Sequence, residues 1–403
     1  MSKTIALLGT LDTKGEEFRF VKELIEAQGH RALVIDTSVI GEPAFEADVS
    51  REEVAQAGGS SIEALQEKED RGEAMRVMSA GAAAVVRRLY DEGRFDGIMS
   101  MGGSGGTAVA TAAMRTLPVG VPKLMVSTVA AGDVSAYVGT RDITMMPSVV
   151  DVAGFNRISR QIYANAAGAI CGMVETEPPP AEEKPLIAAT MFGNTTPCVN
   201  KAREIMEAHG YEVLVFHATG TGGRTMESLI EDGYIAGVLD ITTTEWADEV
   251  CGGVLSAGPT RLEAAAKTGT PQVVVPGCID MANFWARATV PERYQDRNLY
   301  EWNPNVTLLR TNVEENRRMG EIFAEKLNQA TGPVAVFIPM RGVSMLDSEG
   351  EPFWDPEADR AFRDALKANL RSDIPVYELD HNINDPEFAE AVANKLLEFL
   401  GSA

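Results

Sequence analysis

A cluster of glycines follows an apolar segment in the N-terminal half of the chain. Residues 99–107 read Met-Ser-Met-Gly-Gly-Ser-Gly-Gly-Thr, and a run of small residues, 108–114, comes next. This order predicts a buried strand, a glycine turn and a helix that begins near Gly105. The first N–H groups of a helix have no intrahelical partner, so the turn predicts a site for a phosphate-sized anion. The alternative is a turn that only packs a helix closely against a strand.

Two standard nucleotide motifs are missing from this turn. It lacks the GxxxxGK[ST] pattern of a P-loop, and it does not follow GxGxxG cleanly. The turn therefore predicts an anion of phosphate size rather than a named nucleotide, and the missing GxGxxG argues against NAD as the ligand.

Polar groups from other segments are expected at the same edge of a sheet. The run 3–9 predicts a strand, 13–28 a helix, and 31–36 a second buried strand. In a doubly wound sheet the carboxyl ends of parallel strands share one crevice. The cofactor-binding groups expected there are Gly9, Thr10, Asp12, Thr13, Lys14, Asp36, Gly102, Gly103, Ser104, Gly105, Gly106, Thr107 and Ser127.

Three of these side chains have a specific chemical interpretation. Lys14 and nearby hydroxyls suit phosphate oxygens, and Asp12 suits Mg²⁺ or the orientation of Lys14. Asp36 is placed to meet a ribose hydroxyl, or it only caps a turn. Lys14 is otherwise a solvated lysine, although the helix dipole disfavours a cation in a first turn unless it faces an anion.

Length and composition indicate two domains. The 403 residues exceed the ~250–300 at which a single core usually splits. The proline-rich, acidic stretch 176–184 predicts a linker between a first domain at 1–175 and a second at 185–403. We expect an α/β fold with two doubly wound, Rossmann-like domains of mostly parallel sheets.

Charge and hydropathy exclude several classes of partner. The 59 acidic and 36 basic residues give a net charge of −23, which repels a nucleic-acid backbone. No apolar run approaches the ~20 residues of a membrane helix, and no signal-peptide pattern opens the sequence. We therefore expect a cytoplasmic protein with neither nucleic-acid nor membrane partners. Its four cysteines show no CxxC and are typical of reduced thiols: Cys171, Cys198, Cys251 and Cys278.

The second domain repeats the same pattern. The strand expected at 185–192 leads into a polar helix start, and the strand at 212–216 leads into residues 217–227, His-Ala-Thr-Gly-Thr-Gly-Gly-Arg-Thr-Met-Glu. That second glycine turn before a helix predicts another oxyanion-type site. Its ligand-binding residues would be Asn194, Thr195, Gly220, Thr221, Gly222 and Gly223.

Further polar residues follow strands or begin helices in this domain. The catalytic candidates are His217, Glu245, Arg261, Asp280 and Arg341. A histidine in such a loop also caps and bridges loops, and glutamate after a strand also begins an ordinary capped helix. Cys278 is either a nucleophile or a small buried thiol. The aromatic residues of segment 285–305 have no clean period, which indicates a flap or an interface.

Five motifs in order carry a resemblance to one family. They are residues 9–14 (Gly-Thr-Leu-Asp-Thr-Lys), 100–107, 192–198 (Phe-Gly-Asn-Thr-Thr-Pro-Cys), 217–223 and 277–281 (Gly-Cys-Ile-Asp-Met). The chain resembles an uncharacterised bacterial and fungal family that also supplies the amino-terminal domain of the tomato mosaic virus resistance protein. The resemblance implies a two-domain α/β protein, commonly dimeric, whose first domain binds ATP. It places nucleotide contacts at Gly9, Thr10, Asp12, Thr13, Lys14 and 102–107.

Two functional hypotheses follow. In the first, an ATP-binding enzyme also holds a small anionic metabolite in the second domain, where Arg261 or Arg341 clamps a carboxylate. In the second, the chain is a nucleotide-gated binding or regulatory protein that does no chemistry. The sequence does not exclude this hypothesis, because it identifies no general base. A kinase is a weaker interpretation: the turn also resembles the GGDG turn of phosphofructokinase-type kinases, but Ser104 stands where those have the acid.

Overall fold

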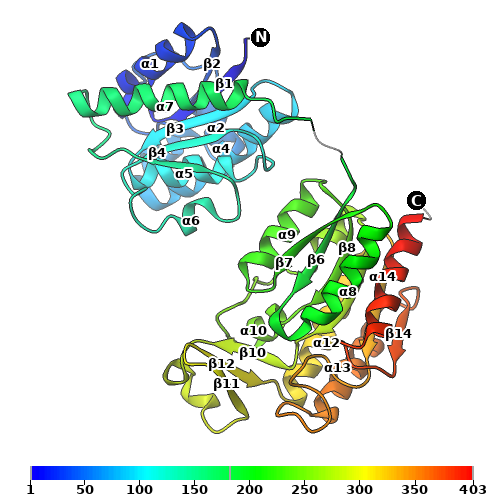
Figure 1. Cartoon of the computed structure of the whole chain (residues 1–403). Coiled ribbons are helices and arrows are strands. Elements are labelled where there is room, and N and C mark those ends of the chain that lie inside the picture. The colour runs from blue at the N-terminus through cyan, green and yellow to red at the C-terminus, as the bar shows by residue number, and fades with distance from the viewer. Residues whose placement is uncertain (1, 181–182, 402–403) are drawn as a thin grey trace. The chain divides into compact units, whose positions relative to one another are not determined.

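The chain divides into two compact units, Met1–Pro180 and Ala181–Ala403 (Figure 1). The computed structural model describes residues 2–180 and 183–401. Each unit has a parallel sheet with helices on both faces. The expected fold class, two Rossmann-like α/β domains with mostly parallel sheets, is confirmed. The boundary between the units falls inside the proline-rich stretch 176–184.

The sheet of the first unit has the strand order β2-β1-β3-β4-β5, and its pairs run parallel. The strands are β1 (Thr4–Gly9), β2 (Arg31–Asp36), β3 (Gly97–Gly102), β4 (Lys123–Ser127) and β5 (Thr144–Pro147). The chain runs outward from β1 in both directions, so the loops after β1 and β3 meet at the centre of one edge.

Helices pack against both faces of this sheet. They are α1 (Leu11–Ala27), α2 (Arg51–Ala57), α3 (Ile62–Lys68), α4 (Arg71–Asp91), α5 (Ser104–Met114), α6 (Ser135–Val138) and α7 (Arg157–Glu175). Because successive strand residues point to opposite faces, Leu7 packs with α1 and α7, whereas Leu8 packs with α4 and α5. The two resulting cores fix the helix starts that border the loop edge.

The main sheet of the second unit has the order β14-β13-β9-β8-β6-β7, and its pairs also run parallel. The strands are β6 (Leu186–Met191), β7 (Glu212–His217), β8 (Ile235–Thr242), β9 (Gln272–Gly277), β13 (Val334–Pro339) and β14 (Val376–Leu379). Val273 and Val275 face one core and Val274 the other, as expected of a strand buried on both faces.

The helices of the second unit also form two layers. Their bounds are η1 (Gly193–Thr195), α8 (Thr196–Ala208), α9 (Thr221–Glu231), α10 (Glu245–Cys251), α11 (Ala264–Thr268), α12 (Val313–Leu327), α13 (Pro356–Asn369) and α14 (Pro386–Gly401). Helices α8 and α14 cover one face of the sheet, while α9, α11, α12 and α13 belong to the cores of the other.

A separate antiparallel sheet was not predicted from the sequence. It has the order β10-β12-β11, with β10 (Met281–Phe284), β11 (Leu299–Asn303) and β12 (Val306–Arg310). Two short turns, η2 (Arg287–Thr289) and η3 (Glu292–Tyr294), join β10 to β11. The segment 285–305 thus has regular structure of its own, and it leads into the β11–β12 hairpin.

Among the described residues, no helix has both the length and the apolar character that crossing a membrane requires.

Candidate functional site

The glycine turn of the first unit joins β3 to α5. Strand β3 ends at Gly102, and Gly103 occupies the N-cap position with extended backbone angles, φ −80° and ψ −166°. In this described segment no side chain caps the helix start. The N–H groups of Ser104, Gly105 and Gly106 therefore lie at a helix N-terminus without intrahelical acceptors. They form a cradle of donors for an anion.

Packing does not require glycine at three positions of this turn. A Cβ added at Gly103 or Gly106 would have its nearest neighbour at 3.8 Å, and one at Gly105 would lie 3.6 Å from Met75 Sδ. In the described backbone none of the three has a positive φ. Close packing accounts only for Gly102, whose Cβ would lie 3.2 Å from Gly106 Cα. The remaining glycines leave space for a ligand to approach the backbone.

Two cationic side chains lie near this part of the sheet edge. Arg71 begins α4, and its Nη2 is 3.9 Å from the Cβ position of Gly105. Lys14 donates a hydrogen bond from Nζ to the carbonyl of Val152, and its backbone departs from helical angles (φ −134°, ψ 18°). The sequence analysis named Lys14 but missed Arg71, because only the packing of α4 against α5 brings residue 71 to the turn.

The loop after β1 lies beside the glycine turn, since Leu8 pairs with Ser100 in the sheet. The hydroxyls of Thr10 and Thr13 are 3.1 Å apart. Asp12 Oδ2 accepts a hydrogen bond from the N–H of Gly41 at 3.1 Å. Its Oδ1 is buried and has no hydrogen-bond partner among the described groups. This oxygen is free to take a cation or a ligand donor.

Four other predicted cofactor residues are placed to support the loops. Asp36 Oδ1 accepts from the N–H groups of Leu11 (3.2 Å) and Ser38 (2.9 Å). The buried hydroxyls of Thr107 and Ser127 are 2.6 Å apart and join the glycine turn to β4. A Cβ at Gly9 would lie 2.0 Å from the ring of Phe18. These residues hold the backbone in position. Hydrogen bonds and packing within the protein therefore explain why these residue types occur here, without a ligand.

The second glycine turn is filled from within the protein. The N–H groups of Gly220 and Gly223 donate to Oε1 of Glu245 at 2.7 and 3.1 Å. A Cβ at Gly222 would lie 1.9 Å from the carbonyl oxygen of His217, and one at Gly223 would lie 2.2 Å from Glu245 Oε2. Both glycines are thus required by packing. The expected oxyanion site at 220–223 already holds a carboxylate, and these two donors are not open to an external anion.

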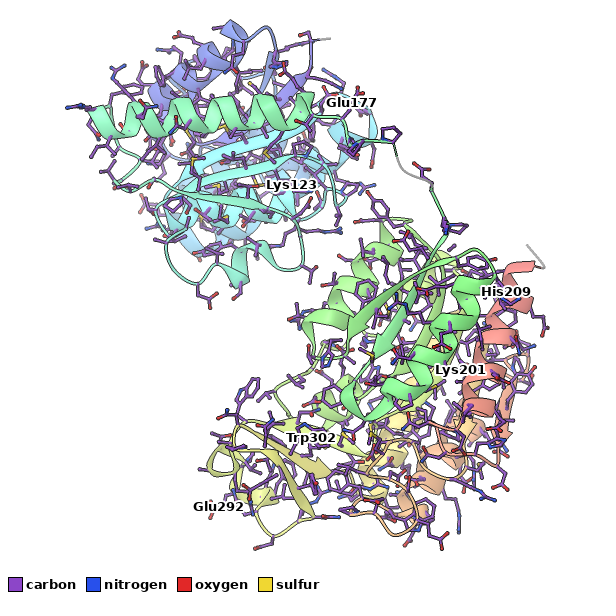
Figure 2. The ribbon with its side chains drawn as sticks, in the orientation of Figure 1. Lys123, Glu177, Lys201, His209, Glu292 and Trp302 are labelled. Atoms are coloured by element: carbon purple, nitrogen blue, oxygen red, sulfur yellow. The ribbon has the colours of Figure 1, made fainter. Side chains whose placement is uncertain are left out.

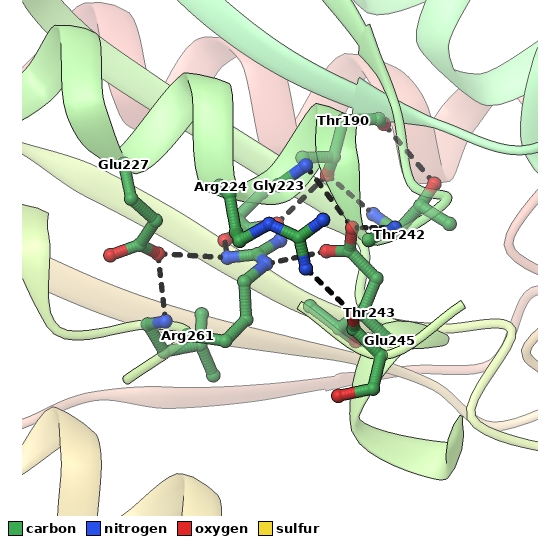
Figure 3. Close-up of polar contacts among 12 residues, drawn as sticks. Thr190, Gly223, Arg224, Glu227, Thr242, Thr243, Glu245 and Arg261 are labelled. Atoms are coloured by element: carbon green, nitrogen blue, oxygen red, sulfur yellow. Dashed lines mark hydrogen bonds and ion pairs between the residues drawn. The ribbon is translucent and has the colours of Figure 1, made fainter. Parts of the chain in front are cut away.

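Arg261 occupies the centre of a buried ion network (Figure 3). It pairs through two nitrogens with Asp240 at 2.6 Å each, and its Nε donates to Glu245 at 2.7 Å. Glu227 contacts the same guanidinium at 3.2 Å. Burial alone would lower the pKa of Arg261, but the charges of Asp240 and Glu245 outweigh burial and hold it well above its usual value. The predicted clamp for a metabolite carboxylate is therefore saturated by the protein's own acids.

Asp280 belongs to a second buried cluster. Ser344 donates to it at 2.8 Å, and Arg310 donates to Asp359 at 2.8 Å and to Asp347 at 3.4 Å. Burial, reinforced by the charge of Asp347, raises the pKa of Asp280 to about 7 and that of Asp359 to about 8. Two carboxyls, Asp347 and Asp359, thus contact one guanidinium, and Asp280 lies within reach of its charge. Asp280 is fully buried, so its altered pKa bears on stability rather than on a solvent-facing substrate.

Two other candidates are also accounted for by local structure. Arg341 forms a two-pronged, solvent-exposed ion pair with Asp380 at 2.7 Å. Cys278 is fully buried, and burial raises the pKa of its thiol. Of the two interpretations of Cys278, the structure favours the buried thiol over a nucleophile.

Asn194, Thr195 and His217 lie together at the carboxyl ends of β6 and β7. Thr195 Oγ1 is 2.7 Å from Thr242 Oγ1, so this hydroxyl is satisfied internally. Asn194 and His217 line a pocket whose opposite wall includes Trp302. The sequence analysis flagged the aromatic segment but did not connect it to these two residues. Within the described chain, no group of three or more His, Cys, Asp or Glu residues could hold a metal ion.

Both units match models of one family. The model described as "Uncharacterised protein family (UPF0261) N-terminal domain" matches residues 3–179. The corresponding C-terminal domain model matches residues 184–400.

Known relatives include bacterial and plant proteins. A UPF0261 protein of Clostridium tetani is 56% identical over 402 residues, covering 99% of this chain and all of that protein. The tomato protein ToMV resistance protein Tm-1(GCR237) is 39% identical; the match covers 98% of this chain and 56% of the tomato protein. A solved UDP-N-acetylglucosamine 2-epimerase from Rickettsia bellii aligns over 100% of this chain and 96% of its own at 10% identity and a TM-score of 0.23. That score carries no information about activity.

Proposed function

The chain belongs to the uncharacterised protein family UPF0261, and on that basis we propose that its first unit binds ATP, with the phosphates on the turn between β3 and α5. The observation that carries the proposal is the uncapped start of α5, where a Cβ at Gly103, Gly105 or Gly106 would meet nothing closer than 3.6 Å. The resemblance described above, which is to this same family, also implies ATP.

The charges around the turn suit a polyphosphate. Aligned peptide dipoles place about half a positive charge at a helix N-terminus. Arg71 adds a full charge beside Gly105, and Lys14 lies on the neighbouring loop, where its Nζ donates to the carbonyl of Val152. Charge-assisted hydrogen bonds to phosphate are stronger than neutral ones, so these side chains would give a nucleoside triphosphate a higher affinity than an uncharged ligand.

The surroundings of Asp12 are consistent with Mg²⁺ as a partner of the phosphates. Mg²⁺ is commonly held by one or two carboxylates together with phosphate oxygens and waters. Asp12 Oδ1, buried and without a partner among the described groups, supplies one such oxygen. When bound, the cation would neutralise phosphate charge, and Asp12 would fix the position of the nucleotide's phosphate end relative to the loop after β1.

We propose ATP binding rather than a specific reaction. Three of the five catalytic candidates, Glu245, Arg261 and Asp280, are at most 1% exposed and engaged in internal networks. This observation favours the alternative of a nucleotide-dependent binding protein over an enzyme that uses these side chains. A metabolite carboxylate would need a cation other than Arg261.

Calorimetric titration of Mg²⁺–ATP into the wild type and the Gly105→Val variant tests the proposal. We expect micromolar binding by the wild type and at least a tenfold loss in the variant. Gly168→Val, in the open helical position of α7, is the matched control and should bind as the wild type does. Release of ADP, measured on the same samples, separates an enzyme from a binding protein. Equal ATP affinity in all three proteins would refute the proposed site.

A further inference from the structure

A pocket of about 140 Å³ lies between the ends of β6 and β7 and the β11–β12 hairpin. The two strand ends contribute Phe192 and His217, whose ring centroids are 5.4 Å apart with the planes at 49°. The hairpin contributes Trp302, Val306 and Leu308. A cavity of this size holds about one benzene-sized ring. Its position at the carboxyl ends of parallel strands is where α/β folds hold ligands.

Trp302 forms the outer wall of this pocket. Figure 2 labels it on the β11–β12 hairpin, and 45% of its surface is exposed. A Cβ placed on Gly193 would be 4.0 Å from Trp302 Cζ2, so the absent side chain of this glycine leaves space beside the indole ring. Together with Phe192 and His217, the indole gives the pocket three aromatic rings. Such rings favour stacking or edge contacts with another flat ring.

Asn194 adds one directional polar group. Its side chain is fully buried, and Nδ2 lies 3.5 Å from the sulfur of Met281. A thioether accepts hydrogen bonds but cannot donate them, so the Asn194 amide is oriented with its nitrogen, the donor, toward the sulfur of Met281. Oδ1 is then a buried acceptor with no partner among the described groups. A buried acceptor is destabilising unless a donor reaches it, and a ligand in this pocket can supply that donor.

The charge of the lining decides the class of ligand. The residues that form the pocket include no Lys, Arg, Asp or Glu. Apart from His217, an anion would find no side chain there that can carry a counter-charge, and it would be repelled by the net charge of −23. We propose that this pocket binds a flat, uncharged ring compound that donates an N–H hydrogen bond to Asn194. This ligand would be separate from the nucleotide proposed for the first unit and distinct from the anionic metabolite expected from the sequence.

Ligand-observed ¹⁹F NMR with 4-fluorobenzamide tests this site on the full chain. The probe is flat, uncharged and carries an N–H donor, whereas 4-fluorobenzoate has the same ring with a negative charge and no donor. We expect the amide, but not the acid, to show line broadening with the wild type. Gly193→Leu, which fills the space, and Trp302→Ala, which removes a wall on another element, should each weaken binding at least fivefold. Gly168→Leu, on an exposed face of α7, is the matched control and should leave it unchanged.

Three results would overturn the proposal. These are no binding of the amide by the wild type, equal binding of the amide and the acid, or undiminished binding by both Gly193→Leu and Trp302→Ala. Addition of Mg²⁺–ATP supplies a further test, since displacement of the amide by ATP would contradict a separate site. Because loss of ATP binding in Gly105→Val does not depend on this pocket, the two proposals fail independently.

Discussion

The carboxylate of Glu245 accepts a hydrogen bond from the N–H of Gly220 at 2.7 Å, and so occupies a glycine turn that would otherwise resemble an anion site. The turn at 102–106 has no corresponding internal carboxylate at its helix start in the described chain. The chain therefore contains two glycine turns that look alike in sequence but differ in whether a side chain of the protein accepts hydrogen bonds from their N–H groups. One is part of the second unit's core, and the other is open.

Removing the charge of Glu245 should destabilise the second unit. Glu245→Gln places an amide N–H₂ group or an uncharged oxygen against the buried Nε of Arg261, so we expect a loss of about 3 kcal/mol. All four tryptophans lie in the second unit, at positions 246, 285, 302 and 354, so their fluorescence during urea unfolding reports on this unit. Glu231→Gln, an exposed site on α9, should change the stability by less than about 0.5 kcal/mol. Equal stabilities would show that the network is not required.

The carboxyls around Arg310 should make the second unit less stable at high pH. The pKa of Asp359 is about 8 in the folded protein and near 4 when unfolded, because burial penalises its charge. The folded state thus binds more protons between these values, and stability falls as the pH rises from about 4 to about 8. The expected slope for one such proton is about 1.4 kcal/mol per pH unit.

The variant Asp359→Asn should flatten this dependence. It removes the titrating group whose pKa burial raises to about 8. Urea midpoints followed by tryptophan fluorescence at pH 5.5 and pH 8 measure the effect. Asp364→Asn, an exposed neighbour on α13, should retain the wild-type slope. A wild-type stability that rises over this range would contradict the assignment.

Arg71 should contribute to nucleotide affinity although it is distant in sequence from the glycine turn. We expect Arg71→Gln to weaken Mg²⁺–ATP binding about tenfold, because a charge-assisted contact to phosphate is lost. Arg76→Gln, an exposed arginine on the same helix, is the comparison. If the two variants bind ATP equally well, Arg71 does not face the phosphates.

Asp12 should link ATP binding to Mg²⁺. In Asp12→Asn we expect weaker binding of ATP in the presence of Mg²⁺ but little change in EDTA, because only the cation loses a charged ligand. The ratio of the two affinities, measured by calorimetry, is the relevant quantity. A variant that lowers both affinities by the same factor would assign Asp12 to the structure of the loop rather than to the cation.

The layout of strands and of the first glycine turn could be predicted from the sequence because both depend on local pattern. Apolar runs that end in glycine or an acid mark buried strands of a parallel sheet. The helix α5 begins at Ser104, within one residue of the expected start. Antiparallel β10 and β11 were missed because they are short and follow no clean alternation.

Whether each candidate site is open or filled by the protein's own side chains depends on contacts between distant segments. Nothing local to residues 220–223 indicates that Glu245 fills the turn. One signal was available: Asp240 interrupts an otherwise apolar strand, and a buried acid there requires a partner, which Arg261 supplies. For Arg71 the sequence offers no comparable sign, since it is an exposed residue brought to the turn by packing of other elements, and for Trp302 the sequence indicated only a flap or an interface.

The contrast between the two turns can be measured directly by glycine-selective ¹⁵N labelling and two-dimensional NMR of the full chain, with signals assigned through single Gly→Ala variants. On addition of Mg²⁺–ATP, the amide signals of Gly103, Gly105 and Gly106 should shift. Those of Gly220 and Gly223, whose N–H groups are bound to Glu245, should stay in place. Shifts at 220 and 223 with none at 103–106 would contradict the account and place the nucleotide on the second unit.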